Sequence, residues 1–215
     1  MLRVSRAHFP VTTLGPGTRL VIWVQGCPLA CRGCMSRDTW DADGGVEVTE
    51  ETLLELWSDA LRRGANGMTI SGGEPLAQPE PLAAFLRAAR SCAAPAGAEP
   101  DFLLYTGFEP GELTPEQEAA AAAADAVITG QYEVHNPTRL IWRGSANQRL
   151  RPHTDLGRRR YTPFLDAVPD AAPVQIGVDD GRLWVIGVPP AGALSRMERA
   201  LRERGVRFQG ATWRP

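Results

Sequence analysis

The sequence predicts an α/β fold in which a parallel sheet is followed by a small α+β unit of ββαβ order. Two observations carry this prediction: strand-like runs alternate with longer helical runs up to about residue 130, and the pattern changes after residue 152. A third observation limits the architecture. The chain has 215 residues, whereas a closed eight-fold β/α barrel typically takes about 250. Any barrel-like arrangement is therefore partial and open on one side.

The first predicted parallel strand spans residues 19–25, a β-branched and aromatic run, RLVIWVQ. It ends at Gly26, where a segment that we call the cysteine loop begins and continues to about residue 45. The first helix follows with Thr49 as its N-cap, apolar residues at helical spacing, and Gly64 as its C-terminal stop. The apolar run at residues 19–25 thus predicts a buried strand, and the cysteines follow its C-terminal end.

Three further strands alternate with two helices before residue 130. They are predicted as a strand at 68–71, a helix at 80–90, a strand at 102–105, a helix at 115–124 and a strand at 126–129. Parallel sheets bind ligands at the C-terminal ends of their strands. The cysteine loop and the Gly72-Gly73-Glu74-Pro75 loop both lie at such ends.

The last third of the chain has a different organisation. Residues 152–173 are loop-like and include the run Arg158 to Arg160, which is typical of a solvated turn. Two strands, 174–178 and 182–186, flank Asp179-Asp180-Gly181, which is a hairpin signal. A helix at 194–203 and a strand at 206–209 complete the ββαβ unit. We therefore predict a core domain at residues 1–151 and a C-terminal extension at residues 152–215.

Composition excludes several classes of partner. The chain has 23 basic and 25 acidic residues, a net charge of -2 and a pI near 6.0, whereas nucleic-acid-binding domains usually show a basic excess. It contains no apolar run of about 18 to 20 residues and no signal-peptide pattern at its N-terminus. We therefore expect a cytoplasmic protein with neither nucleic acid nor membrane as partner.

Three of the four cysteines form a Cys-x3-Cys-x2-Cys cluster, Cys27, Cys31 and Cys34, while Cys92 stands alone as a small hydrophobic residue. Thiolates favour iron-sulfur clusters or zinc. A structural zinc site needs a fourth ligand, for which the chain offers Cys92, His8, His135 and His153. No histidine forms a short pair with another ligand, so the spacing favours iron-sulfur. Three cysteines on a 4Fe-4S cluster would leave one iron free for a substrate or cofactor.

The Gly72-Gly73-Glu74-Pro75 segment is by itself an ordinary turn sequence. Its glycines give a bare backbone edge, and its carboxylate can meet a cation. At a strand end beside the cysteine loop, it fits the amino-acid end of S-adenosylmethionine, whose ammonium group needs backbone carbonyls and an anion.

Together these segments resemble the radical S-adenosylmethionine (radical SAM) superfamily, and within it the activating proteins of anaerobic ribonucleotide reductase. The resemblance extends in order across about residues 7 to 150. It rests on Cys27-x3-Cys31-x2-Cys34 and on the segments Gly15-Pro16-Gly17-Thr18-Arg19, Thr39-Trp40, Ser71-Gly72-Gly73-Glu74-Pro75-Leu76, Tyr105-Thr106-Gly107-Phe108 and Trp142-Arg143-Gly144-Ser145-Ala146-Asn147-Gln148.

The resemblance implies an open partial (β/α) barrel of radical SAM type whose cofactors are a 4Fe-4S cluster and S-adenosylmethionine. An electron from a flavodoxin or ferredoxin would cleave S-adenosylmethionine reductively, and the resulting 5'-deoxyadenosyl radical would abstract hydrogen from a glycine of a partner glycyl-radical enzyme. The cluster ligands would be Cys27, Cys31 and Cys34. The residues implied to contact S-adenosylmethionine are Gly33, Cys34, Met35, Gly72, Gly73, Glu74, Gly130, Gln131 and Tyr132.

Two alternatives remain at the sequence level. The activating proteins usually end near the position of Gln148, so the residues from Pro152 onward have no recognised counterpart. The first alternative is therefore a radical SAM enzyme that modifies a peptide or small molecule in a biosynthetic pathway. The second is a zinc-stabilised binding module without radical chemistry.

Overall fold

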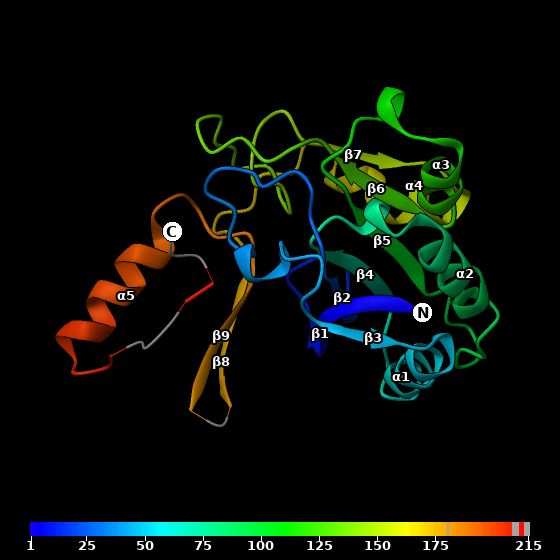
Figure 1. Cartoon of the computed structure of the whole chain (residues 1–215), viewed down its shortest axis with the longest axis horizontal. Helices are drawn as coiled ribbons and strands as arrows, with labels where there is room; N and C mark the ends of the chain where they lie inside the picture. The colour runs from blue at the N-terminus through cyan, green and yellow to red at the C-terminus, as the bar shows by residue number, and fades with distance from the viewer. Residues whose placement is uncertain (180, 208–210, 213–215) are drawn as a thin grey trace.

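A computed structural model describes residues 1–179, 181–207, 211 and 212. Its central sheet has seven strands in the order β3-β1-β2-β4-β5-β6-β7 (Figure 1). The strands are β1 (Leu2–Val11), β2 (Arg19–Val24), β3 (Val46–Val48), β4 (Gly67–Gly72), β5 (Asp101–Tyr105), β6 (Ala126–Thr129) and β7 (Arg149–Pro152). This mixed α/β architecture with a mostly parallel sheet confirms the predicted fold class.

The centre of the sheet is the predicted parallel unit β2-β4-β5-β6. Its register pairs Trp23 with Ser71 and Val24 with Gly72, so β2 and β4 end side by side. The cysteine loop and the Gly72–Glu74 loop consequently leave the same edge of the sheet. Ligands gather at this edge in parallel sheets.

The flanks of the sheet differ from the prediction, because β1, β3 and β7 are antiparallel to their neighbours and none of the three was expected. Strand β1 contains register irregularities between Val4 and Arg6 and between His8 and Val11, which interrupt a period-two pattern. Strands β3 and β7 have only three and four residues. Segments this short carry too little periodicity to be recognised from sequence.

One face of the sheet is covered by the predicted helices, α1 (Glu50–Arg62), α2 (Pro79–Arg90) and α3 (Pro115–Ala122). Thr49 caps α1 as expected, since its hydroxyl accepts a hydrogen bond from the Thr52 amide at 3.3 Å. The fully buried Trp57 packs edge-on against Phe102 of β5, at a ring-centroid distance of 5.8 Å. Burial of these apolar helix faces holds the parallel strands in place.

Part of the expected loop at 152–173 is a helix, α4 (Asp155–Tyr161). Only Gly157 and Tyr161 of this helix are buried, so its sequence shows no apolar face from which a helix could be predicted. The arginine run therefore belongs to a helix and not to a turn. Arg158 and Arg159 are exposed as expected and pair with Asp155 and Glu99, whereas Arg160 is half-buried.

Helix α4 is tied to the sheet through a buried polar cluster. The Tyr161 hydroxyl donates to the carboxylate of Asp101, which also pairs with Arg19 at 2.8 Å. Both side chains of that ion pair are fully buried. The division into domains at residues 151 and 152 stays a prediction; β7 crosses it, and α4 packs on the core sheet.

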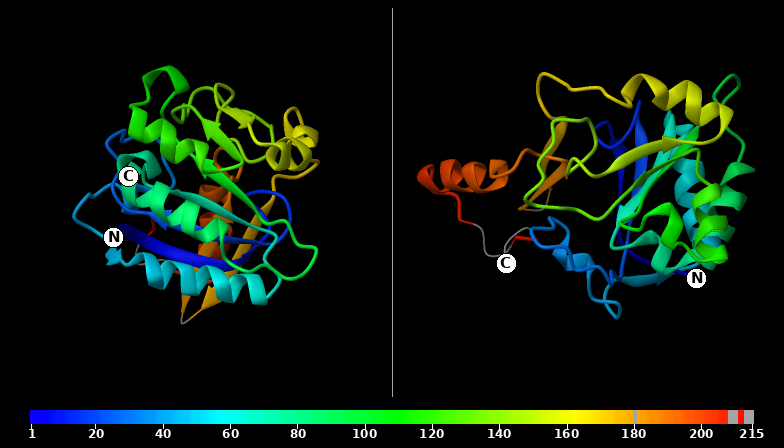
Figure 2. Two further views of the ribbon diagram at one scale, coloured as in Figure 1. Left: turned by 90° about the vertical axis from the view of Figure 1, so that its right-hand side faces the viewer. Right: turned by 90° about the horizontal axis from the view of Figure 1, so that it is seen from above.

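The C-terminal extension contains the predicted hairpin, β8 (Val174–Asp179) and β9 (Arg182–Gly187), and the predicted helix α5 (Ala193–Glu203). The expected strand at 206–209 is wrong for Val206 and Arg207, which are not in a strand, and its other residues lie outside the described part. The hairpin stands beside the β1–β2 end of the sheet, and α5 projects beyond it (Figures 1 and 2).

Candidate functional site

The cysteine loop is closed on itself at its base, directly after β2. The Gly26 amide donates to the Thr39 carbonyl at 2.8 Å, and the Cys27 amide donates to the Trp40 carbonyl at 3.1 Å. Within the loop, the Cys34 amide donates to the Cys31 carbonyl at 3.1 Å. These bonds hold the three cysteines on a short, folded segment at the end of the sheet.

The Gly72–Glu74 loop packs backbone to backbone against this base. The Gly73 amide donates to the Val24 carbonyl, and the Glu74 amide donates to the Gly26 carbonyl, both at 2.8 Å. A Cβ atom at Gly72 would lie 2.4 Å from the Val24 nitrogen, so only glycine fits. The glycines predicted to face a ligand are thus also required for the approach of β4 to the segment after β2.

Glu74 joins the loop after β4 to the loop after β5. Its carboxylate, 1% exposed, accepts hydrogen bonds from the Leu76 amide at 2.9 Å, the Thr106 hydroxyl at 2.8 Å and the Gly107 amide at 2.7 Å. Burial raises the pKa of Glu74, and these donors oppose that shift. A carboxylate has about four acceptor positions, so one remains beyond these three bonds.

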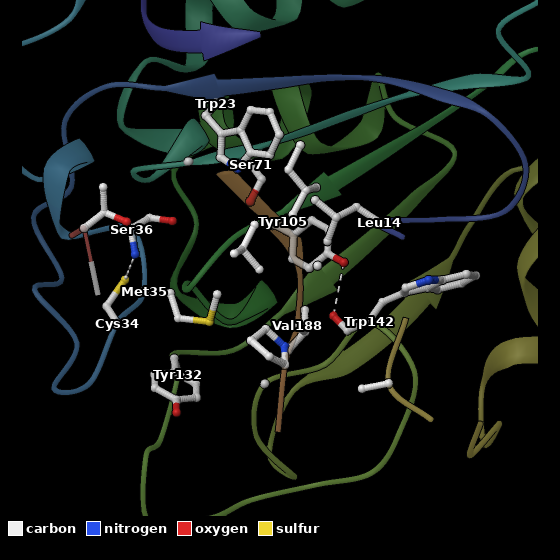
Figure 3. A pocket seen from close by; sticks show the side chains of 18 of the residues that line it. Leu14, Trp23, Cys34, Met35, Ser36, Ser71, Tyr105, Tyr132, Trp142 and Val188 are labelled. Atoms are coloured by element: carbon white, nitrogen blue, oxygen red, sulfur yellow. Dashed lines mark hydrogen bonds between the residues drawn. The ribbon is translucent and has the colours of Figure 1, made fainter. Parts of the chain in front are cut away.

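A cavity of about 1950 Å³ opens at this edge of the sheet (Figure 3). The loops after the four parallel strands all line it, and those after β2, β4 and β6 contribute predicted site residues. The lining includes Cys27, Cys31, Cys34, Met35, Gly72, Gly73, Glu74, Thr106, Gly107, Gly130 and Tyr132. Figure 3 shows Cys34, Met35 and Tyr132 along one side, and a bond from the Ser36 amide to the Cys34 sulfur spans 3.4 Å.

Two residues predicted to contact S-adenosylmethionine do not line the cavity. Gly33 has φ of +80° and lies against Val134, so it permits the turn between the last two cysteines. Gln131 is exposed, and its side-chain amide donates to the Leu29 carbonyl at 3.3 Å. Thr106 and Gly107 line the cavity and bind Glu74, although the sequence analysis did not assign them to the site; the available signal was their position after the third parallel strand.

The donor set fits a 4Fe-4S cluster better than a single zinc ion. Burial raises the pKa of the Cys27 and Cys34 thiols. Within the described residues, which include all histidines and cysteines, no group of three or more His, Cys, Asp or Glu side chains is close enough to hold one ion. A cluster binds each cysteine through a different iron, so its ligands stand farther apart than those of one ion. All three cysteines of the predicted cluster site line the open cavity.

The comparisons with known proteins agree with this chemistry. The model of the 4Fe-4S single cluster domain family matches residues 13–151. The anaerobic ribonucleoside-triphosphate reductase-activating protein of Enterobacteria phage T4 is 36% identical over 146 residues, which cover 66% of this chain and 88% of the phage protein. The proteins of the same name from Haemophilus influenzae and Escherichia coli K12 are 35% and 31% identical, with 92% and 93% of their lengths covered.

The chain belongs to this family of activating proteins. The recognition from sequence motifs is thereby confirmed: the protein is a radical SAM enzyme of the activating type, with a 4Fe-4S cluster and S-adenosylmethionine as cofactors. Among solved structures, QueE from Escherichia coli is 16% identical, with a TM-score of 0.36 over 62% of this chain and 73% of that one.

The family match ends at residue 151, and each of the three relatives covers 66% of the chain. The C-terminal extension therefore lies outside the matched region. The described part of the chain contains no helix that is long and apolar enough to cross a membrane.

Proposed function

We propose that this radical SAM activase abstracts hydrogen from a glycine of a partner glycyl-radical enzyme, of which anaerobic ribonucleotide reductase is the foremost candidate. The observation that carries the proposal is the convergence of the cysteine loop and the Gly72–Glu74 loop on one open cavity. The names of the relatives support the identity of the partner. When bound, the reduced cluster supplies the electron that cleaves S-adenosylmethionine into methionine and the 5'-deoxyadenosyl radical.

In this proposal, Cys27, Cys31 and Cys34 hold the cluster. The backbone of Gly72 and Gly73 and the remaining acceptor position of Glu74 orient the amino-acid end of S-adenosylmethionine. The other residues proposed to contact S-adenosylmethionine flank these two groups: Gly33, Cys34 and Met35 beside the cluster, and Gly130, Gln131 and Tyr132 after β6. The protein's own contribution is to position both cofactors and to exclude water from the reacting atoms.

The electron donor in this proposal is a flavodoxin or ferredoxin. The expected compartment is the cytoplasm, where reducing conditions keep the cysteines as free thiols.

An anaerobic reconstitution tests the proposal. The loaded enzyme is incubated with S-adenosylmethionine, a reductant and the anaerobic ribonucleotide reductase from the same genome. We expect 5'-deoxyadenosine in solution and a glycyl-radical doublet in the electron paramagnetic resonance spectrum of the reductase. Formation of 5'-deoxyadenosine without a glycyl radical in any glycyl-radical enzyme of that genome would contradict the assignment of the partner.

The second candidate is radical modification of a peptide or small molecule. The observation that favours it is that residues of the C-terminal extension, which has no counterpart in the matched region, line the same cavity as the cysteines. Mass spectrometry of small-molecule and peptide fractions after turnover distinguishes it, because the modified product would then be separate from any large partner enzyme.

A further inference from the structure

Strand β9 and the segment that follows it form one side of the cavity. We call residues 182–191 the hairpin wall. All of them line the cavity. In Figure 3, Val188 of this wall lies among side chains of the core, with Met35 and Tyr132 on one side and Tyr105 and Trp142 on the other. A segment outside the family match thus enters the space next to the predicted cofactor contacts.

The hairpin wall is fixed to the core by specific contacts. Trp184 packs against the ring of His8 on β1, with a centroid distance of 4.6 Å. Ile186 is buried in an apolar cluster with Leu14 and Trp23, and the Thr13 hydroxyl donates to its carbonyl at 3.1 Å. On the partner strand β8, the side-chain amide of Gln175 exchanges two hydrogen bonds with the backbone of residues 10 and 12. These contacts make the wall a built part of the site.

The cavity exceeds the space that a small cofactor needs. Pockets for drug-sized ligands have about 300–1,000 Å³, whereas this cavity has about 1950 Å³. The predicted cofactor contacts lie on the loops after the parallel strands, and the hairpin wall lines the same cavity from a separate part of the chain. This remaining space is available to the molecule that donates hydrogen.

The lining of the cavity carries unmatched positive charge. Arg139, Arg182 and Arg207 are exposed and line it, and none of their side chains makes an ion pair or hydrogen bond with another described residue. Within the described part, the acidic residues of the lining are Glu74 and Asp170. The Glu74 carboxylate already accepts hydrogen bonds from Leu76, Thr106 and Gly107. Among the described residues the lining is therefore basic, although the chain as a whole has a net charge of -2. Such a surface favours a ligand that carries carboxylates.

We propose that the hairpin wall is part of the substrate site and selects an extended peptide segment with a central glycine and flanking acidic residues. Val188 and Trp184 contact the narrow apolar centre of the segment, and Arg182 and Arg139 pair with its carboxylates. The inference rests on the proposed function, because hydrogen abstraction from glycine requires a peptide segment with small side chains to reach the cofactors. It extends that function by assigning substrate selection to residues outside the family match.

Binding of synthetic peptides to the full-length, reconstituted holoenzyme tests this inference. The probes have a central glycine between alanines and carry either aspartates or arginines at both ends. Isothermal titration calorimetry under anaerobic conditions and at low salt is expected to show that the aspartate peptide binds at least about tenfold more tightly. Equal affinity of the two peptides for the unmodified enzyme would overturn the inference.

Two variants and two matched controls locate the binding surface. Val188→Trp places a bulky indole beside the predicted cofactor contacts and is expected to abolish binding of both peptides, whereas Ile176→Trp, at an exposed position of β8 outside the lining, leaves it unchanged. Arg182→Glu is expected to remove the preference for aspartate, whereas Arg199→Glu on α5 retains it. Arg182 is exposed, so Arg182→Glu is expected to fold and still tests the inference if Val188→Trp does not fold. Unchanged binding in Arg182→Glu would overturn the inference.

The same variants separate this inference from the proposed function. A glycyl radical formed on the reductase by Val188→Trp at the unmodified rate would refute the hairpin wall while the activase function stands. The expected pattern of peptide binding, without a glycyl radical in any partner, would support the hairpin wall and refute the partner assignment.

Discussion

Gly73 lies against Gly26 so closely that a Cβ atom at Gly73 would stand 2.2 Å from the Gly26 carbonyl oxygen. The same atom would stand 2.9 Å from the Thr39 carbonyl oxygen, and both neighbours are backbone atoms that cannot rotate away. The loop after β4 therefore supports the base of the cysteine loop directly. Changes at Gly73 must move the segment that carries the cysteines.

Gly73→Ala is expected to destabilise the fold by about 1–3 kcal/mol, the usual cost of overpacking. It should also lower the iron content after reconstitution, because the base of the cysteine loop is displaced. Urea unfolding and iron analysis measure the two effects. Gly111→Ala, where a Cβ meets nothing within 4 Å, is the matched control. Equal iron content in Gly73→Ala and the control would contradict the expected coupling between the two loops.

Cys31→Ala is expected to abolish cluster assembly and formation of 5'-deoxyadenosine. Cys92→Ala should retain both, because Cys92 is half-buried beside the helix-covered core and does not line the cavity. Metal analysis after anaerobic purification of the unmodified chain should give about four irons, whereas a zinc-stabilised module would give about one zinc. Full iron content in Cys31→Ala would refute the assignment of this ligand.

Arg19→Ala is expected to cost about 3–5 kcal/mol of unfolding free energy, because it leaves the carboxylate of Asp101 buried without its ion-pair partner. The Arg19 guanidinium also donates to the Thr69 hydroxyl at 2.7 Å and the Met68 carbonyl at 2.6 Å. Arg62→Ala removes an exposed ion pair with Asp59 and should cost about 0–1 kcal/mol. Urea denaturation of both variants makes the comparison; similar losses would disprove a special role of the buried pair.

Stability is expected to fall above about pH 10, the ordinary pKa of tyrosine. Burial raises the pKa of Tyr161 well above that value and raises the pKa of Tyr105 as well. In this pH range the unfolded chain releases tyrosine protons that the folded chain retains, so rising pH favours unfolding.

Tyr161→Phe removes one of these groups, so its unfolding free energy should depend less steeply on pH above about 10. At neutral pH the variant should be less stable by about 1–2 kcal/mol, because the Tyr161 hydroxyl no longer donates to Asp101. Urea unfolding at a series of pH values measures both effects. Parallel pH profiles for the variant and the unmodified protein would show that Tyr161 does not titrate on unfolding.

Local patterns were sufficient to predict the parallel centre of the sheet and the helices on its outer face. The β-branched run before Gly26, the Thr49 cap and the stop at Gly64 act within a few residues of one another, and the structure contains each of them. Strands β3 and β7 escaped prediction because they are short and are stabilised by neighbours distant in sequence. Helix α4 escaped because only Gly157 and Tyr161 of its residues are buried.

The sequence by itself determined the chemistry of this protein, since the spacing of three thiols and the Gly72–Glu74 turn are local features that imply the cofactors. Only the tertiary structure decided which distant residues line the cavity around the predicted cofactor contacts. It gave Glu74 its donors from the loop after β5 and placed Val188, which follows Cys34 by more than half of the chain, in the same cavity. The physical reason is that contacts between distant segments depend on how complete elements pack, which no local period or spacing encodes.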